Sequence, residues 1–171
     1  NYTGQEIGDL DFSVVGVEVI QSVQTADQGV PLIRSRDALA RVYATVQGTT
    51  PLLPEVGLEV RVNGDLVAEP TIAVGSNAQL QGRDRSDLAS SVNWTIPGQY
   101  VQPGLTLRVV LDPDDRVPEI DETNNAFPPT GGEWFDVNSI DALPLTLVPV
   151  HQAAHGGTGD VDLGNATSFT T

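Results

Sequence analysis

Acidic side chains and an asparagine pair are concentrated in LDPDDRVPEIDETNNAF, residues 111–127. Carboxylates gathered in this way can bind a metal ion, can serve as a general acid and base, or can close turns between strands. Each use needs a different spacing, so the sequence itself discriminates among them. The residues in question are Asp112, Asp114, Asp115, Glu119, Asp121, Glu122, Asn124 and Asn125.

A calcium-binding EF-hand loop needs oxygen ligands at alternate positions and a glutamate at position twelve. Counted from Asp112, position five is Arg116 and position twelve is Thr123, so this stretch is not an EF-hand. Calcium bound in another geometry by Asp112, Asp114 and Asp115 stays open as an alternative. We otherwise expect no cofactor.

The turn interpretation fits the residue types best. Asp and Asn side chains hydrogen-bond neighbouring backbone N–H groups and tolerate turn geometries. Residues 112–115 are therefore expected to close a turn, and residues 121–125 to tie the chain as it enters its last strand. We predict that the acids chiefly shape a connection between two strands.

Catalytic use of the same carboxylates finds no support in the rest of the sequence. A glycosidase pair needs a cleft and side chains that stack sugars, yet the chain has two Trp, three Tyr and no recognisable cleft motif. No G-x-S-x-G elbow is present, and the lack of cysteine excludes a thiolate nucleophile and a disulfide framework. We therefore predict no catalytic residues and a protein that is not an enzyme.

The two histidines, His151 and His155, form an H-x-x-x-H pair. On a helix this spacing would place both imidazoles on one face, where they could bind zinc with Asp160 nearby. However, the pair runs directly into glycines and lacks the glutamate of H-E-x-x-H. A solvated tail or an interdomain segment is the favoured interpretation, and zinc stays open as the alternative.

Period-two alternation of apolar residues dominates the sequence that must position these groups. In VGLEVRV, residues 56–62, valine and leucine alternate with glycine and charged residues, and the following NGD predicts a hairpin turn. Similar patterns predict strands in VVGVEVI, ALARVYATV, LVAEPTIAV, SVNWTI and LTLRVVL. No window shows a helical stripe, and residues 75–91 are expected to form a loop. The pattern of short strands and turns predicts an all-β antiparallel sandwich.

The alternation also predicts which side chains face the core. In VVGVEVI, we expect Val15, Val17 and Val19 to share one face. In ALARVYATV, inward apolar residues alternate with residues on the opposite face. There we expect Ala40, Val42, Ala44 and Val46 to point inward, opposed to Arg41, Tyr43 and Thr45.

The net charge of the chain is strongly negative. Over 171 residues it is −15, and every basic residue is an arginine. Such a surface repels nucleic acid and anionic membranes, and no basic cluster compensates locally. No apolar run approaches the roughly 18–20 residues that span a bilayer. We therefore expect neither nucleic-acid binding nor direct membrane insertion.

The stretch GLTLRVVLDPDDRVPEIDETNNAF resembles the carboxy-terminal signature of CARDB domains, the cell adhesion related domain found in bacteria. It shows an apolar strand, then D-P-D, then E-x-D-E-T-N-N and a resumed strand. VEVIQSVQ and VPLIRSRDALARVYATV are similar to the opening strands of bacterial surface proteins that carry such modules. The resemblance covers residues 15–137, but the loop at 75–91 is long and the chain from 139 onward lies outside the family pattern.

The resemblance implies an immunoglobulin-like antiparallel β-sandwich of seven to eight strands with a C-terminal extension. We expect an N-terminal lead at 1–11 and a CARDB-like domain at 12–138. Residues 139–171 are expected to form an extra strand and a tail, or to begin a following domain of a longer precursor.

The resemblance further implies a bacterial protein that is secreted or displayed on the cell surface. We predict a non-catalytic binding, adhesion or spacer module, whose partners are an unidentified protein or glycan and the neighbouring domains of the parent chain. One alternative is an ancillary domain of a secreted hydrolase, a metallopeptidase whose catalytic domain lies outside this fragment. Another is a linker stiffened by calcium.

Overall fold

The computed structural model describes residues 10–48, 53–140, 151–152 and 157–158. Its contacts divide the chain into two units, Asn1–Ser139 and Ile140–Thr171, which are described separately. Within the described ranges, no helix has both the length and the apolar character needed to cross a membrane.

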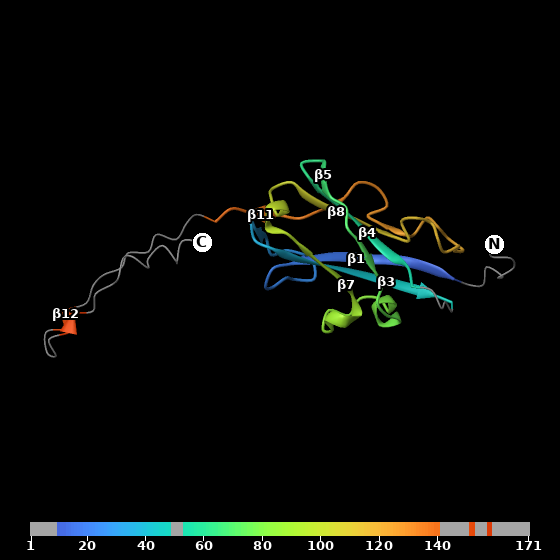
Figure 1. Ribbon diagram of the computed structural model, residues 1–171, viewed down its shortest axis with the longest axis horizontal. Helices are drawn as coiled ribbons and strands as arrows, with labels where there is room; N and C mark the ends of the chain where they lie inside the picture. The colour runs from blue at the N-terminus through green and yellow to red at the C-terminus, as the bar shows by residue number, and fades with distance from the viewer. Residues whose placement is uncertain (1–9, 49–52, 141–150, 153–156, 159–171) are drawn as a thin grey trace. The chain divides into compact units, whose positions relative to one another are not determined.

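One sheet of the first unit has three antiparallel strands in the order β1-β3-β7 (Figure 1). β1 spans Asp11–Ile20, β3 spans Ala38–Gln47 and β7 spans Val92–Ile96. Valine and other small apolar residues recur along these strands, which suits a sheet with one face in the core. β3 is the central strand, since it pairs with β1 on one side and with β7 on the other.

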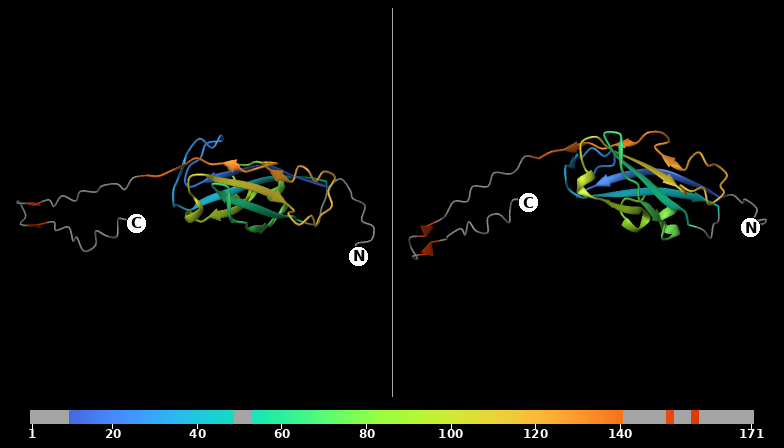
Figure 2. Two further views of the ribbon diagram at one scale, coloured as in Figure 1. Left: turned by 90° about the horizontal axis from the view of Figure 1, so that it is seen from above. Right: turned by 45° about the horizontal axis from the view of Figure 1, so that its top comes forward.

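The second sheet has six strands, all in antiparallel pairs, and it packs against the first (Figure 2). Its main path is β10-β8-β4-β5, while β9 pairs with β8 and β6 pairs with β4. The bounds are β4 Glu55–Val62, β5 Asp65–Ala68, β6 Thr71–Ala73, β8 Leu105–Leu111, β9 Ala126–Phe127 and β10 Glu133–Trp134.

The hairpin predicted after VGLEVRV is confirmed. Asn63 and Gly64 turn the chain from β4 into β5 with φ of 53° and 91°, and Asn and Gly are the residues that adopt positive φ most readily. The stretch LVAEPTIAV differs from the predicted single strand, because it forms both β5 and β6, each paired with β4. The break falls at Glu69 and Pro70, where proline has no N–H to donate to a ladder.

Short elements complete the described chain. β2 (Leu32–Ile33) pairs in parallel with β11 (Val137–Asn138). In the second unit, β12 (His151–Gln152) pairs antiparallel with β13 (Gly157–Thr158). Short 3-10 turns lie at Asn77–Leu80 (η1), Leu88–Ser90 (η2) and Gly98–Tyr100 (η3).

The inward residues of the two sheets form one apolar core. Alternate residues of β4 and β8 are fully buried, and they share this core with inward residues of β1, β3 and β7. The predicted all-β, immunoglobulin-like antiparallel sandwich is thereby confirmed. Its largest fully buried apolar side chains include Phe12, Leu58, Leu80, Ile96, Leu105, Leu107 and Leu111.

A bulge in β1 overturns part of the predicted face pattern. The pairing of β1 with β3 shifts register between Val14 and Gly16. Because the extra residue of a bulge is left unpaired, the alternation of inward and outward side chains is interrupted there. Val15 is therefore 42% exposed, contrary to the prediction, whereas Val17 and Val19 are buried as predicted.

The outer edge of β1 is covered by a side-chain amide. Gln28 Nε2 donates to Val17 O at 2.9 Å, and Gln28 Oε1 accepts from Val19 N at 3.0 Å. The amide therefore occupies the backbone groups that a further strand would use. Along this described part of β1, the edge is not open to a partner strand.

Candidate functional site

Three groups of polar side chains in the described chain are candidates for ligand binding. The first is the connection between β8 and β9, which we call the acidic connection, residues 112–125. The second is the outer face of the three-stranded sheet, and the third is the outer face of the six-stranded sheet. The hydrogen bonds and exposure of each group decide whether it can bind a ligand.

The acidic connection begins with a turn closed by Asp112. Asp112 N donates to Glu55 O at 2.8 Å, and Asp112 Oδ2 accepts from Val117 N at 2.7 Å. Asp112 and Asp115 have φ of 44° and 50°, a left-handed conformation that Asp adopts more readily than most residues. The carboxylate of Asp112 is thus used within the turn and is buried there.

Glu119 links the acidic connection to β1. This buried carboxylate accepts hydrogen bonds from Phe12 N and, at 2.8 Å, from Asn125 Nδ2. Glu122 completes the network, because its two oxygens accept from Glu119 N at 3.0 Å and from Asn125 Nδ2 at 3.1 Å. The network therefore joins the first strand, the connection and the chain entering β9.

The environment of Glu119 favours its neutral form. Burial raises the pKa of Glu119 to about 7, although the hydrogen bonds from Phe12 and Asn125 favour the charged form. The nearby carboxylates of Glu122 and Asp112 raise the pKa further. Glu119 is thus a carboxyl group that titrates near neutral pH inside the fold.

Two more contacts tie the acidic connection to the start of β1. Asn124 Nδ2 donates to Asp11 Oδ1 at 3.0 Å, and Ile120 N donates to Leu10 O, also at 3.0 Å. Two of the exposed acids have local partners: Asp121 Oδ1 accepts from Thr123 N at 2.9 Å. Asp114 forms an ion pair with Arg116.

No group of three or more His, Cys, Asp or Glu side chains is arranged to hold a metal ion in the part of the chain that the structure describes. Asp112, Asp114 and Asp115 are therefore not brought together as such a group. His151 lies in β12, of which only the backbone is described, and His155 lies outside the described residues.

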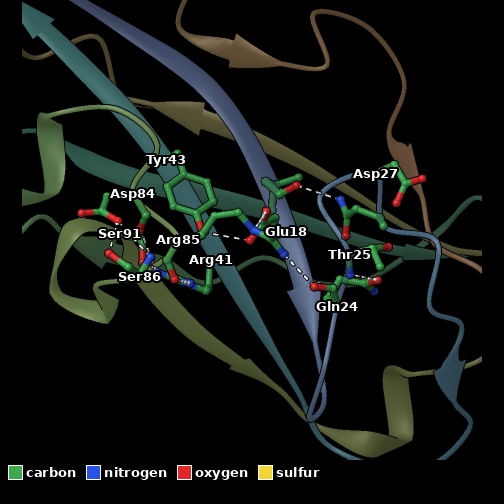
Figure 3. Close-up of polar contacts among 12 residues, drawn as sticks. Glu18, Gln24, Thr25, Asp27, Arg41, Tyr43, Asp84, Arg85, Ser86 and Ser91 are labelled. Atoms are coloured by element: carbon green, nitrogen blue, oxygen red, sulfur yellow. Dashed lines mark hydrogen bonds and ion pairs between the residues drawn. The ribbon is translucent and has the colours of Figure 1, made fainter.

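On the outer face of the three-stranded sheet, Glu18 is almost completely buried, at 1% exposure. Figure 3 shows Glu18 beside Tyr43 and Arg85. Tyr43 Oη donates to Glu18 Oε2 at 2.9 Å, and Arg85 Nε lies 2.7 Å from Glu18 Oε1. Burial raises the pKa of Tyr43 to about 12, and the hydrogen bond to the Glu18 carboxylate adds to the rise. The Tyr43 hydroxyl is therefore held as a donor to Glu18.

Arg41, opposite Glu18 across the strand pair, fastens the loop after η1 to this face. Its guanidinium donates to three loop carbonyls, of Asp84 at 3.3 Å, Arg85 at 3.1 Å and Asp87 at 2.8 Å. The guanidinium carbon also lies 5.2 Å from the centre of the Tyr43 ring, a cation–π distance.

These contacts bury side chains that the alternation places on the outer face. Arg41 is 5% exposed and Tyr43 is fully buried, since the loop at 81–91 covers them. A polar hollow of about 390 Å³ beside the loop is lined by Glu18, Ile20, Gln24, Arg41, Arg85 and Ser86. Its charged groups are paired with each other and with the loop, so the cluster holds the loop in place.

The outer face of the six-stranded sheet carries a more open site, which we call the Trp134 groove. Trp134 on β10 is opposite Thr106 on β8, and Thr106 is opposite Arg61 on β4. Cross-strand partners point to the same face of a sheet, so the three side chains form one row. In the next row, Arg108 of β8 is opposite Glu59 of β4.

The Trp134 groove has a volume of about 580 Å³ and combines an exposed indole with paired charges. Trp134 is 70% exposed. Glu59 binds both arginines, with Oε1 2.7 Å from Arg108 Nη1 and Oε2 3.2 Å from Arg61 Nη2. Burial raises the pKa of Glu59, but Arg108 and Arg61 outweigh it and hold the pKa below its usual range. The groove is completed by Gly64, Pro129, Thr130, Gly131 and Gly132.

None of the groove residues was among the candidates that we singled out from the sequence. Trp134 carries a usable signal, because Phe135 and Val137 are buried and Trp134 falls on the opposite parity of the same stretch. By contrast, nothing in the sequence predicts which residues of β8 pair with β10. Without that register, Trp134 cannot be placed beside Arg61 and Arg108.

The fold and these clusters define a β-sandwich module. In the part of the chain that the structure describes, its buried polar groups serve the fold, and the Trp134 groove carries an exposed aromatic residue. The CARDB family model matches residues 37–128, more than half of the chain. The chain therefore belongs to the CARDB family. This family identifies it as an adhesion-related bacterial module of a type that is typically non-catalytic and common in surface proteins.

Comparison with solved structures finds the CARDB domain of the PF1109 protein from Pyrococcus furiosus, crystallised in complex with di-metal ions. The two chains are 16% identical, with a TM-score of 0.46, and the match covers 77% of this chain and 94% of the other. No curated protein matches this sequence significantly.

Proposed function

We propose that this chain is a non-catalytic binding module of a larger bacterial protein that is secreted or displayed on the cell surface. It binds a protein or a glycan through the Trp134 groove. The observation that carries the proposal is the 70% exposure of Trp134 beside that groove.

An exposed indole is a strong source of binding free energy. Covering about 100 Å² of its apolar surface contributes roughly 2–3 kcal/mol, and Trp is enriched among the residues that dominate binding interfaces. The paired charges of Glu59, Arg61 and Arg108 supply polar contacts that fix the orientation of a ligand.

The other two polar clusters support the assignment by contrast. The carboxylates of Asp112 and Glu119 accept hydrogen bonds from the chain itself. Arg41 is bound to loop carbonyls, and Glu18 is bound to Tyr43 and Arg85. These groups are occupied in holding the fold, whereas the indole is presented to solvent.

The test measures adhesion of residues 1–171 to four immobilised probes: peptidoglycan, chitin, cellulose and collagen. Trp134→Ala should weaken binding to whichever probe the wild-type protein binds, by on the order of tenfold. Val23→Ala is the matched control, because Val23 is also 70% exposed but lies outside the groove. Equal binding by Trp134→Ala and the wild type would refute the groove as the binding site.

A further inference from the structure

We infer that the Trp134 groove takes a saccharide that bears a carboxylate group, such as a uronic acid. The inference rests on the proposed binding function and names the chemical class of the ligand. Trp134 would stack on the face of one sugar ring, while Arg108 and Arg61 would bind the carboxylate. The charge of the groove, the unused donors of the two arginines and the short sheet edge support this ligand class.

The groove is locally positive on a strongly acidic protein. The whole chain has a net charge of −15 with eight basic residues. Three ionisable residues line the groove, two arginines and one glutamate, which leaves one net positive charge there. An anionic ligand is repelled by the acidic surface elsewhere and is attracted here, so charge complementarity favours a carboxylate over a cationic ligand.

Glu59 holds the guanidinium groups of Arg61 and Arg108 in place, and each group keeps N–H donors that are not used in these contacts. Among the described residues, Arg108 uses Nη1 for Glu59, and Arg61 uses Nη2 for Glu59 and Nη1 for Gly64 O. A guanidinium has five N–H donors in a planar fork, and such a fork binds a carboxylate in a bidentate manner. Glu59 thus orients the forks and leaves donors for an external carboxylate.

The spacing of the groove suits a short saccharide. Trp134 and Arg61 lie on the same row with β8 between them, so about 10 Å of sheet separates them. Arg108 is diagonal to Trp134 on the neighbouring strand, at about 7–8 Å. A sugar ring stacked on the indole can therefore place a carboxylate, its own or that of the next ring, against an arginine.

The segment beside the indole closes the groove on one side. A Cβ on Gly132 would lie 2.8 Å from Thr106 Cβ, so the backbone there packs directly on the floor of the groove. Only glycine permits this close approach without a shift of the neighbouring chain. The recess is bordered by backbone, which suits a flat ring better than a bulky helix.

A peptide strand is the competing occupant, and the sheet edge disfavours it. β10 consists of two residues, Glu133 and Trp134, so an added strand would find a very short ladder of backbone hydrogen bonds. Strand addition gains its affinity from such ladders. The affinity at this edge must come from side chains, and these are an indole and two guanidinium groups.

The experiment uses residues 1–171 and follows Trp fluorescence and heat of binding with three soluble probes: trigalacturonate, an alginate trisaccharide and a hyaluronan hexasaccharide. We expect at least one to bind. The uncharged methyl ester of that probe should bind at least about tenfold more weakly. Arg108→Gln, Arg61→Gln and Trp134→Ala should each weaken binding by a similar factor, and Arg36→Gln, at an exposed arginine away from the groove, should not.

Melting temperatures of all variants separate loss of binding from loss of folding. Trp134→Ala, at an exposed position, is the variant expected to keep the wild-type melting temperature. Equal binding of the methyl ester, or preferential binding of hexaglutamate, would overturn the inference. Absence of binding to all three acidic saccharides would also overturn it. If Trp134-dependent adhesion to peptidoglycan, chitin, cellulose or collagen were still observed, the proposed function would stand and only the ligand class would be wrong.

Discussion

The Tyr43 hydroxyl donates a 2.9 Å hydrogen bond to Glu18 Oε2 on the buried outer face of the three-stranded sheet. The second oxygen of Glu18 lies 2.7 Å from Arg85 Nε, which belongs to the covering loop. A buried carboxylate is costly unless both oxygens find partners. The pair therefore makes the packing of the loop and the stability of the sheet depend on each other.

Removing the Tyr43 hydroxyl should destabilise the protein. Tyr43→Phe leaves one oxygen of a buried carboxylate without its donor, and we expect the free energy of unfolding in urea to fall by about 1–3 kcal/mol. In the double variant with Glu18→Gln, the two effects should be non-additive by about 0.5 kcal/mol or more. Strict additivity would show that the two side chains do not interact.

Replacing Arg41 should release the loop while the sheets stay intact. Arg41→Lys keeps the charge but loses the planar fork that binds the carbonyls of Asp84, Arg85 and Asp87. Backbone amides of residues 84–91 should exchange with deuterium on the order of tenfold faster, as measured by mass spectrometry. The control is Arg36→Lys, at an exposed position; unchanged protection in Arg41→Lys would contradict the role given to Arg41.

Glu119 should give the protein a stability that declines as the pH rises toward neutrality. Its pKa is about 7 in the folded chain against an ordinary value of 4.5, so the folded state binds more protons between these values. The contribution of Glu119 to the free energy of unfolding is complete below pH 4.5. It is lost as the pH rises through 7, and the loss is on the order of 2–3 kcal/mol. Urea unfolding from pH 5 to 8 measures it, and Glu119→Gln should flatten the slope; an unaltered slope would assign the effect to other groups.

Asp112 should tolerate Asn but not Ala. Asn keeps an oxygen that can accept from Val117 N and also tolerates a φ of 44°. We expect Asp112→Asn to change the free energy of unfolding by less than about 1 kcal/mol and Asp112→Ala to lower it by about 1–3 kcal/mol. Equal effects of the two substitutions would show that the oxygen of the side chain is not what closes the turn.

Calcium should leave the melting temperature unchanged, because the acidic connection acts as a strand-to-strand turn. The melting temperature of residues 1–171 is measured in EDTA and again with calcium at about 100 times a micromolar dissociation constant. A bound ion would add about 2.7 kcal/mol at that excess. A rise that EDTA reverses and that Asp112→Asn/Asp114→Asn abolishes would make this connection a metal site instead.

The strands of this fold could be predicted where local pattern and tertiary packing agree. VGLEVRV alternates strictly and LTLRVVL does so except at Val110, and their inward apolar residues lie in the core. Val15 escaped prediction because the bulge at Val14 and Gly16 depends on how β1 pairs with a distant strand. Pro70 did hold a usable signal, since proline interrupts a ladder, and it divides a stretch that alternation alone assigns to one strand.

The candidate site was less predictable, because it depends on contacts between segments far apart in sequence. The side chains of Arg41 and Tyr43 point to the outer face of the sheet, as the alternation predicts. They are buried because residues 81–91 pack over them. The Trp134 groove needs the registers of both β10 and β4 on β8. Amino-acid type and spacing identify which side chains leave the core, but not which of them meet on the surface.

The parallel pairing of β2 with β11 has a mechanical consequence. Leu32 N donates to Asp136 O at 2.8 Å, and Arg34 N donates to Asn138 O at 2.9 Å, where the described first unit ends. Tension on the chain beyond this point draws β11 lengthwise along a strand that runs in the same direction. Both hydrogen bonds are then loaded in shear together instead of opening one after the other. The strand pair therefore resists extension of the chain at this end of the sandwich.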